Sequence, residues 1–339
     1  ERSGVLCIGS TLVDYGKTID AYPPRDALAM IEDISRSTGG AALNMSRDLR
    51  RLGAGFPVEL IGCVADDDDG SFILEACASD AIETGRVRFR AGATTAFTDV
   101  MVEREGGRRT FFTHLGTLGL LEVEPSELAS VEARILHVGS LGFYPLMEQT
   151  EPDGSSGWSR LLAAAQAAGM NTNMELATLA PERLEMLAGP CLPHLDSLIV
   201  NELEASALTG VSVSAPDVDA PVDWAAMEEL ARGLIERGVA SLAVVHFPAG
   251  AVAAMPGGQV LRQGSVRLAP AQVVRTTGAG DAFAAGVIYG LHEGWSVDAC
   301  LRLGAAASAA CIREAHTSDG IGTVDECLAL ADELGYRPS

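Results

Sequence analysis

Short apolar segments of strand length alternate with helical patterns along most of the chain. The apolar segments lie at residues 5–10, 58–64, 134–140, 196–202 and 241–247. Patterns of helical spacing separate them, near residues 40–52, 70–78, 158–168 and 224–237. Short strands that are apolar on both sides are buried on both faces, as in a parallel sheet covered by helices. The pattern predicts an α/β fold, with a hairpin near 252–264 and a mostly helical region from residue 281.

Two segments interrupt this alternation, at about 11–35 and 93–115. Both carry alternating β-branched and polar residues, as in TLVDYGKTID and TTAFTDVMVE. A period of two indicates half-exposed antiparallel strands, which cannot belong to the buried parallel sheet. We therefore expect a small separate sheet, in a position that suits a lid over a cleft.

The charge of the chain limits its partners. It has 24 basic and 46 acidic residues, a formal net charge of −22. Nucleic acids and anionic membrane surfaces bind basic surfaces, so neither is an expected partner. No apolar run approaches the ~20 residues of a membrane span. A small phosphorylated ligand remains compatible, because nearby donors outweigh a distant, screened field.

The seven cysteines are odd in number and never form a C-x-x-C pair. Several lie in apolar runs, so we expect buried free thiols rather than disulfides or a zinc site. Free thiols are typical of a reducing compartment, which predicts a cytoplasmic protein.

The segment 275–286, RTTGAGDAFAAG, combines a glycine turn with the start of an apolar helix. The amides of Gly278, Ala279 and Gly280 are unshielded, and the first turn of a helix offers free N–H groups at its positive end. The segment fits either an anion site or a plain tight turn. Asp281 also has two interpretations, a helix N-cap or a carboxylate that takes a proton or holds a metal.

A second glycine turn, STGGAALN at 37–44, opens another predicted helix. Gly39 and Gly40 would let a ligand approach the backbone, and Asn44 would face the same helix end one turn later. The alternative is an ordinary strand-to-helix turn. Asp14 lies just past the first apolar segment, where a carboxylate either accepts hydrogen bonds from sugar hydroxyls or occupies a simple turn.

Asn201 and Glu204 directly follow the apolar segment DSLIV. Open α/β sheets bind ligands at the carboxyl ends of their strands, and an amide with a carboxylate suits magnesium-bound water and phosphate. The alternative is a helix cap with a glutamate in the first turn.

Four motifs, GSTLVD, STGGAALN, VNELEA and TTGAGDAFAAG, occur in this order. Together they resemble the ribokinase-like (PfkB) carbohydrate kinases, over roughly residues 4–335. The resemblance implies a three-layer α/β/α sandwich with a mostly parallel sheet and a small β-strand lid. It also implies one kinase domain over 1–339, with lid strands inserted at about 11–35 and 93–115.

The resemblance also assigns roles to site residues. Asp281 matches the catalytic base that takes the proton of the substrate hydroxyl. Around it, the resemblance implies an anion hole for ATP phosphate, a magnesium and phosphate motif, and sugar contacts. These positions are Thr276, Thr277, Gly278, Ala279 and Gly280 for the phosphate; Asn201 and Glu204 for Mg²⁺; and Asp14, Gly39, Gly40 and Asn44 for the sugar.

Three positions depart from the family pattern or extend it. Arg275 stands where the family often has an Asp that belongs to a monovalent-cation site. Its guanidinium could replace the charge of a bound cation, so we expect no potassium requirement; the alternative is a surface arginine without a role. Ala41 replaces the lysine of ribokinase itself, which argues against ribose as the substrate. Arg109, on the second lid segment, either holds an anionic substrate or is solvated.

The resulting hypothesis is an ATP-dependent kinase that phosphorylates a hydroxyl of a sugar or sugar derivative, with Mg²⁺. The alternatives are a nucleoside kinase, and a catalytically inactive sugar-binding or regulatory relative. The resemblance further implies a homodimer joined through the lid.

Overall fold

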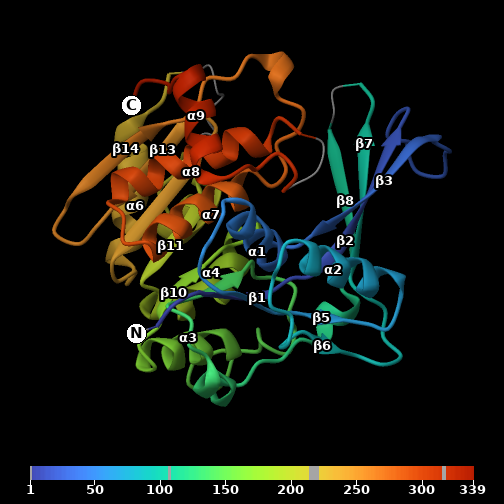
Figure 1. The fold of residues 1–339 in the computed structure, drawn as a ribbon, viewed down its shortest axis with the longest axis horizontal. Coiled ribbons are helices and arrows are strands. Elements are labelled where there is room, and N and C mark those ends of the chain that lie inside the picture. The colour runs from blue at the N-terminus through green and yellow to red at the C-terminus, as the bar shows by residue number, and fades with distance from the viewer. Residues whose placement is uncertain (1, 106–107, 214–220, 315–317) are drawn as a thin grey trace.

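The apolar segments predicted as strands lie together in one main sheet. The computed structural model describes residues 2–105, 108–213, 221–314 and 318–339. In these ranges the main sheet has eight strands, in the order β14-β13-β12-β11-β10-β9-β1-β4 (Figure 1). The strands from β4 across to β12 pair in parallel, and β12, β13 and β14 pair antiparallel. The strands are β1 (Val5–Gly9), β4 (Val58–Ile61), β9 (Ile135–Gly139), β10 (Asn171–Met174), β11 (Ser197–Asn201), β12 (Leu242–Phe247), β13 (Gly250–Ala254) and β14 (Val260–Gly264).

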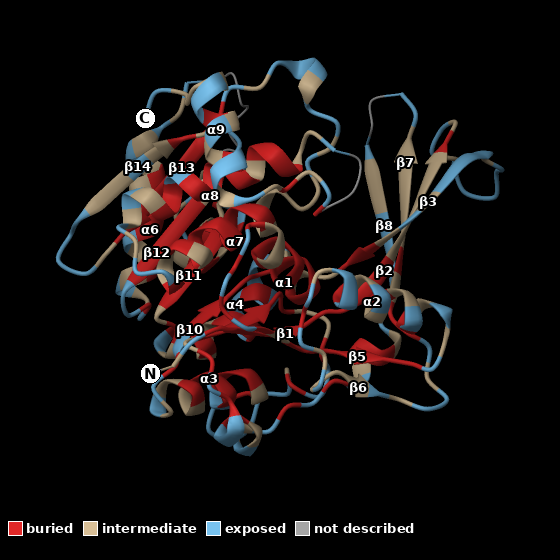
Figure 2. Ribbon diagram, viewed as in Figure 1, coloured by how far each residue is buried: buried red, intermediate tan, exposed pale blue. Residues whose placement is uncertain are grey.

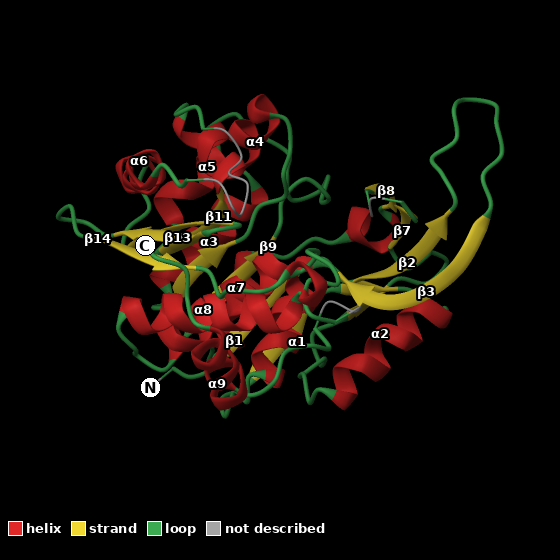
Figure 3. Cartoon of the chain, turned by 90° about the horizontal axis from the view of Figure 1, so that it is seen from above, coloured by secondary structure: helices red, strands yellow, loops and turns green. Residues whose placement is uncertain are grey.

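Helices cover both faces of this sheet, which confirms the predicted three-layer α/β/α fold (Figure 3). Alternate residues of β1 point to opposite faces of the sheet. Leu6 therefore belongs to the core on the side of α3–α6, and Cys7 belongs to the core on the side of α1, α7, α8 and α9. The helices are α1 (Ala41–Arg51), α2 (Asp68–Ser79), α3 (Gly157–Ala167), α4 (Pro181–Ala188), α5 (Glu202–Thr209), α6 (Trp224–Glu236), α7 (Ala279–His292), α8 (Val297–Cys311) and α9 (Val324–Leu334). None of the described helices is both long and apolar enough to span a membrane. The seven cysteines are buried free thiols, as predicted.

Strand β10 was not predicted from the apolar pattern, because its sequence, NTNM, is polar. It is nevertheless a central strand, since its polar side chains are bonded inside the sheet. Asn173 Nδ2 donates to Ser197 Oγ at 2.9 Å, and Asn173 Oδ1 lies 2.8 Å from His137 Nδ1. Buried polar groups that are paired in this way lose little free energy on leaving water.

A second sheet of four strands stands beside the main domain, in the order β3-β2-β7-β8. Its strands are β2 (Leu12–Ile19), β3 (Ile31–Gly39), β7 (Phe97–Glu103) and β8 (Arg109–His114). They lie in the two segments predicted to form the lid, and we call this sheet the lid. The expectation of antiparallel pairing throughout is wrong, because β2 and β7 pair in parallel. Strand β2 is the first strand of the hairpin β2–β3, and β7 is the first strand of the hairpin β7–β8. Both first strands start at the main domain and run outward, so they lie side by side in the same direction.

The two faces of the lid differ in what covers them. On one face, Tyr15 Oη donates to Asp69 of α2 at 2.6 Å, and the Arg36 guanidinium lies 4.2 Å from the centre of the Phe72 ring. Asp14 and Arg109 belong to the opposite face. Alternate residues of a strand share a face, so Asp14 lies on the same face as Thr18. Thr18 pairs with Val102, which pairs with Arg109, so Arg109 lies on that face too; Thr98 and Thr113 join it through their pairing with Asp14. The outer parts of the lid are largely exposed or intermediate in burial, whereas the main sheet is mostly buried apart from its edge strand β14 (Figure 2).

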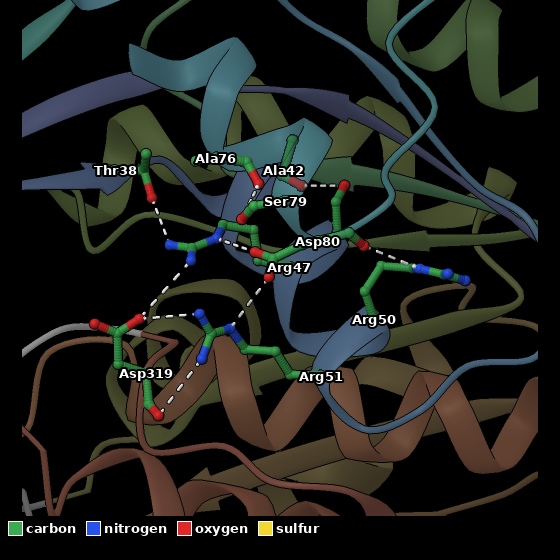
Figure 4. Close-up of polar contacts among 10 residues, drawn as sticks. Thr38, Ala42, Arg47, Arg50, Arg51, Ala76, Ser79, Asp80 and Asp319 are labelled. Carbon is green, nitrogen blue, oxygen red and sulfur yellow. Dashed lines mark hydrogen bonds and ion pairs between the residues drawn. The ribbon is translucent and has the colours of Figure 1, made fainter.

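A network of charges, largely buried at Arg47 and Asp80 and partly exposed at Asp319, holds helix α1 in place (Figure 4). Arg47 Nε donates to Asp80 at 2.6 Å, and Arg47 Nη1 donates to Thr38 Oγ1 at 2.7 Å. One turn later, Arg51 Nη2 lies 3.1 Å from Asp319 Oδ1. The network joins α1 to the end of α2, to the end of β3 and to the loop before α9. It therefore sets the position of the N-terminus of α1, which carries the glycine turn.

We expect Arg47→Ala to lower the free energy of unfolding by about 3 kcal/mol, because it removes the nearer and more buried of the two arginines that pair with Asp80 and leaves only Arg51, 3.7 Å away. The side chains of Arg47 and Asp80 are both 11% exposed. Arg104→Ala is the matched control, since Arg104 pairs with Glu32 at the surface with side chains 56% and 36% exposed. That change should lower the free energy by less than about 1 kcal/mol. Urea unfolding measures both values, and equal losses would contradict a structural role for the buried pair.

Candidate active site

The two glycine motifs meet where the N-termini of α1 and α7 lie against each other. Asn44 Nδ2, on α1, donates to Asp281 Oδ2, on α7, at 2.6 Å. The two residues are 237 positions apart in the sequence. The fold therefore brings together the sugar-contact and phosphate motifs that the sequence analysis treats separately.

The N-terminus of α7 has free donors at its positive end. Gly278 is the N-cap residue, and Asp281 lies in the first turn without a capping hydrogen bond, so the capping interpretation of Asp281 is wrong. The amide of Ala279 donates to the carbonyl of Thr276 at 3.2 Å. Within the described chain, the amides of Gly280 and Asp281 have no acceptor. Free N–H groups at the positive end of a helix dipole form a site that suits an anion.

The carboxyl of Asp281 titrates near neutrality. Its pKa is raised from 3.8 to about 7. Burial is the largest cause and the negative charge of Glu175 adds to it, whereas the hydrogen bond from Asn44 and the nearby His137 lower the pKa. A carboxyl with this pKa is half ionised near pH 7, so it can take up or release a proton under ordinary conditions.

Asp14 lies against the glycine turn of α1. A Cβ on Gly39 would lie 2.2 Å from Asp14 Oδ2, so only glycine lets this carboxylate come so close to the backbone. Gly40 is the N-cap of α1, with φ of 99°, and a Cβ there would lie 2.4 Å from the carbonyl oxygen of Ser10. Burial raises the pKa of Asp14 to about 6, and the attraction of Arg275 opposes that rise.

Asn201 and Glu204 form a capping box at the start of α5. Asn201 Oδ1 accepts from the amides of Leu203 and Glu204 at 3.0 and 2.9 Å, and Glu204 Oε2 accepts from the amide of Asn201 at 3.1 Å. Glu204 Oε1 accepts from Thr178 at 3.0 Å, and burial raises the pKa of Glu204 to about 7. The helix-cap interpretation is therefore correct, but a carboxylate with one donor on each oxygen keeps lone pairs for a further ligand.

Glu175 is a site residue that the sequence analysis missed. It directly follows β10, and its side chain is 9% exposed. Its Oε2 lies 3.3 Å from His137 Nε2, yet neither atom makes a hydrogen bond to another described residue. Its charge acts on both Asp281 and Glu204. A polar side chain directly after a strand is the signal that identified Asn201. The same signal is present at Glu175, but the strand before Glu175 is too polar to be recognised in the sequence.

Arg109 and Arg275 meet at Thr277. Arg109 Nη1 reaches from the lid and donates to Thr277 Oγ1. Arg275 Nε and Nη2 both donate to the carbonyl of Thr277 at 3.2 Å. A cavity of about 420 Å³ lies between β8 and the segment 273–277, and both arginines line it together with Phe111 and Thr276. Both positions singled out in the sequence thus face a single cavity.

No group of three His, Cys, Asp or Glu residues within the described ranges is arranged to hold a metal ion. Mg²⁺ commonly takes only one or two protein carboxylates and keeps several waters. The carboxylate oxygens of Glu204, and Oε2 of Glu175, which accepts no hydrogen bond from a described residue, fit an ion bound in that way.

Comparisons with known proteins identify the family of the chain and neighbours of its fold. A family described as pfkB family carbohydrate kinase matches residues 2–323. The 5-dehydro-2-deoxygluconokinase of Shouchella clausii (strain KSM-K16) is 23% identical, over 97% of this chain and 95% of its own length. The probable chloroplastic fructokinase-6 of Arabidopsis thaliana is 28% identical, over 85% of this chain and 70% of its own. The structure of Arabidopsis thaliana ribokinase complexed with ribose and ATP matches the fold with a TM-score of 0.81 at 22% identity, over 98% of this chain and 99% of that one.

The family match covers most of the chain, and these relatives, whose names are those of sugar kinases, align along most of it as well. The chain belongs to the pfkB family of carbohydrate kinases.

Proposed function

We propose that this protein transfers the γ-phosphoryl group of ATP to a hydroxyl of a sugar or sugar derivative. One observation carries the proposal: a carboxyl that titrates near neutrality, Asp281, lies beside two free amides at the N-terminus of α7. A proton acceptor next to an anion site is what phosphoryl transfer to an alcohol requires.

In this mechanism Asp281 accepts the proton of the substrate hydroxyl. Asn44 holds Oδ2, and no described residue donates to Oδ1, which is left for the hydroxyl. As the hydroxyl oxygen bonds to the γ-phosphorus, the bond from that phosphorus to the oxygen of ADP breaks and the proton moves to Asp281. The amides of Gly280 and Asp281 stabilise the charge on the transferring group.

Asp14 is the acceptor for other hydroxyls of the sugar. It shares a lid face with Thr98 and Thr113, whose hydroxyls lie 3.0 Å apart. Hydroxyls and a carboxylate on one face suit a polyhydroxylated ligand better than a flat nucleobase. This lining favours a sugar over a nucleoside as the acceptor.

Support for ATP comes from the fold neighbour, which is ribokinase complexed with ribose and ATP. The residues that would hold Mg²⁺, through its waters, are Glu204, Asn201 and Glu175. When bound, the ion would neutralise the negative charge that develops on the phosphates during transfer. The two carboxyl groups and the amide contribute by orienting the hydrated ion relative to the N-terminus of α7.

Asp281→Asn should lower turnover by about 10²- to 10⁴-fold, because an amide cannot accept the proton. The measurement is ATP consumption with a panel of sugars, sugar acids and nucleosides. Ligand binding, followed by calorimetry, should persist, because Asn keeps the shape of Asp281.

Asp298→Asn is the matched control, since Asp298 is exposed in the first turn of the neighbouring helix α8. Unchanged turnover in Asp281→Asn would refute the assigned base. A second measurement shows whether the variant folds. The folded-state pKa of Asp281 is raised from 3.8 to about 7, so wild-type stability falls as pH rises between these values. The asparagine variant escapes that loss and should be the more stable protein above pH 7.

The value of kcat/KM should fall about tenfold per unit as the pH drops below about 7, because the base acts only when ionised. Asn44→Leu should move this midpoint upward, since the hydrogen bond from Asn44 lowers the pKa of Asp281. Ser46→Ala, on the same helix but bonded to the carbonyl of Ala42, should leave the midpoint in place. An unchanged midpoint in Asn44→Leu would remove Asn44 from the mechanism.

Replacing potassium chloride by tetramethylammonium chloride at the same ionic strength should leave turnover unchanged. The charges of Asp14, Asp281 and Asp319 all act on Arg275, so its guanidinium already supplies the positive charge at this position. Steady-state kinetics in the two salts is the test, and a strict potassium requirement would overturn this role of Arg275.

A further inference from the structure

Two arginines from separate parts of the chain converge on one residue. Arg109 comes from the lid and Arg275 from the segment before α7, and their guanidiniums bind the hydroxyl and the carbonyl of Thr277. Both line the cavity of about 420 Å³ beside this residue. Cavities of this size suit a small organic ligand.

Convergence of like charges in a partly buried place is unfavourable unless something compensates it. Burial lowers the pKa of both guanidiniums, and repulsion from Arg275 lowers that of Arg109 further. Arg109 forms no ion pair within the described ranges, whereas its neighbour Arg108 pairs with Glu103 at 3.0 Å. The chain is strongly acidic, yet no carboxylate of the described residues pairs with Arg109.

The position of the cavity relates it to the sugar site. Arg109 and Asp14 lie on the same face of the lid, and that face is opposite the one covered by α2. Arg275 interacts electrostatically with both Asp14 and Asp281. One molecule between the lid and α7 can therefore contact Asp14, place a hydroxyl at Asp281 and extend into the cavity of the two arginines.

We propose that Arg109 and Arg275 bind a carboxylate or phosphate group carried by the substrate itself, so that the substrate is an anionic sugar derivative rather than a neutral sugar. Guanidinium groups bind both oxyanions with paired, charge-assisted hydrogen bonds. The bound anion gives Arg109 the negative partner that no described residue supplies, and it offsets the repulsion between the two guanidiniums. The choice of reaction rests on the proposed function, but the binding site does not.

The test measures binding to the full chain without nucleotide, by calorimetry and thermal unfolding at constant ionic strength. The probes are sugars of four to six carbons, each as the neutral sugar, its sugar acid and its phosphate ester. At least one anionic member should bind about 10- to 100-fold more tightly than its neutral counterpart. Arg109→Gln should abolish that preference, and Arg109→Lys should keep part of it, because lysine retains the charge but not the paired geometry.

Arg108→Gln is the matched control, since Arg108 is the adjacent residue and its side chain is 83% exposed. It should leave the preference unchanged. Arg275→Gln is a second variant outside the lid, and it should reduce the preference as Arg109→Gln does. If no anionic probe binds more tightly than its neutral counterpart, or if Arg108→Gln has the same effect as Arg109→Gln, the proposal is wrong.

Two results separate this proposal from neighbouring ones. If Arg109→Gln weakens ATP binding and leaves the preference among sugars intact, the anion is the nucleotide phosphate and the proposal is overturned. If anionic sugars bind through Arg109 but are not phosphorylated, the binding site stands and the proposed kinase function fails. If neutral sugars are phosphorylated and no anionic sugar is preferred, the proposed kinase function stands and the anion-binding proposal fails.

Discussion

The hydrogen bond between Asn44 and Asp281 is the contact on which the site depends. It forms only because α1 and α7 pack on the same face of the sheet with their N-termini together. Both helices begin at glycines: Gly40 lets the start of α1 pack against the carbonyl of Ser10, and Gly278 precedes the free amides of α7. The buried pair of Arg47 and Asp80 holds α1 from its other side. A shift of α1 would therefore move the glycine turn, Asn44 and the environment of Asp281 together.

The electrostatics of the site follow from placing several carboxyls at neighbouring strand ends. Burial raises the pKa of Asp14, Glu204 and Asp281 to between about 6 and about 7, and the charge of Glu175 acts on two of them. An acidic cleft would repel a phosphorylated ligand if these charges were uncompensated. The free amides of α7 and the guanidinium of Arg275 supply the opposite charge at short range. The binding of a phosphorylated ligand would therefore depend on these nearby donors and not on the net charge of the chain.

The apolar pattern predicted most of the fold, because strands buried on both faces are visible as apolar runs. Strand β10 was missed because Asn173 and Thr172 are satisfied by partners distant in sequence, and Glu175 was missed with it. Residue types alone also left Asn201 and Glu204 open between cap and ligand, since both interpretations use the same oxygens. The parallel pairing of β2 with β7 depends on where two separate hairpins leave the main domain, which no local pattern records.

Side-chain contacts join the lid to the main domain. Near the main domain it is held by side-chain contacts to α2, such as that of Tyr15 with Asp69. Farther out along β8, the bond from Arg109 to Thr277 joins it to the phosphate motif. A hydrogen bond from a guanidinium to a neutral hydroxyl is weak, whereas the charge-assisted hydrogen bonds from two guanidiniums to one oxyanion are strong. An anionic substrate bound by both guanidiniums would thus strengthen the link between the lid and the segment that leads to Asp281.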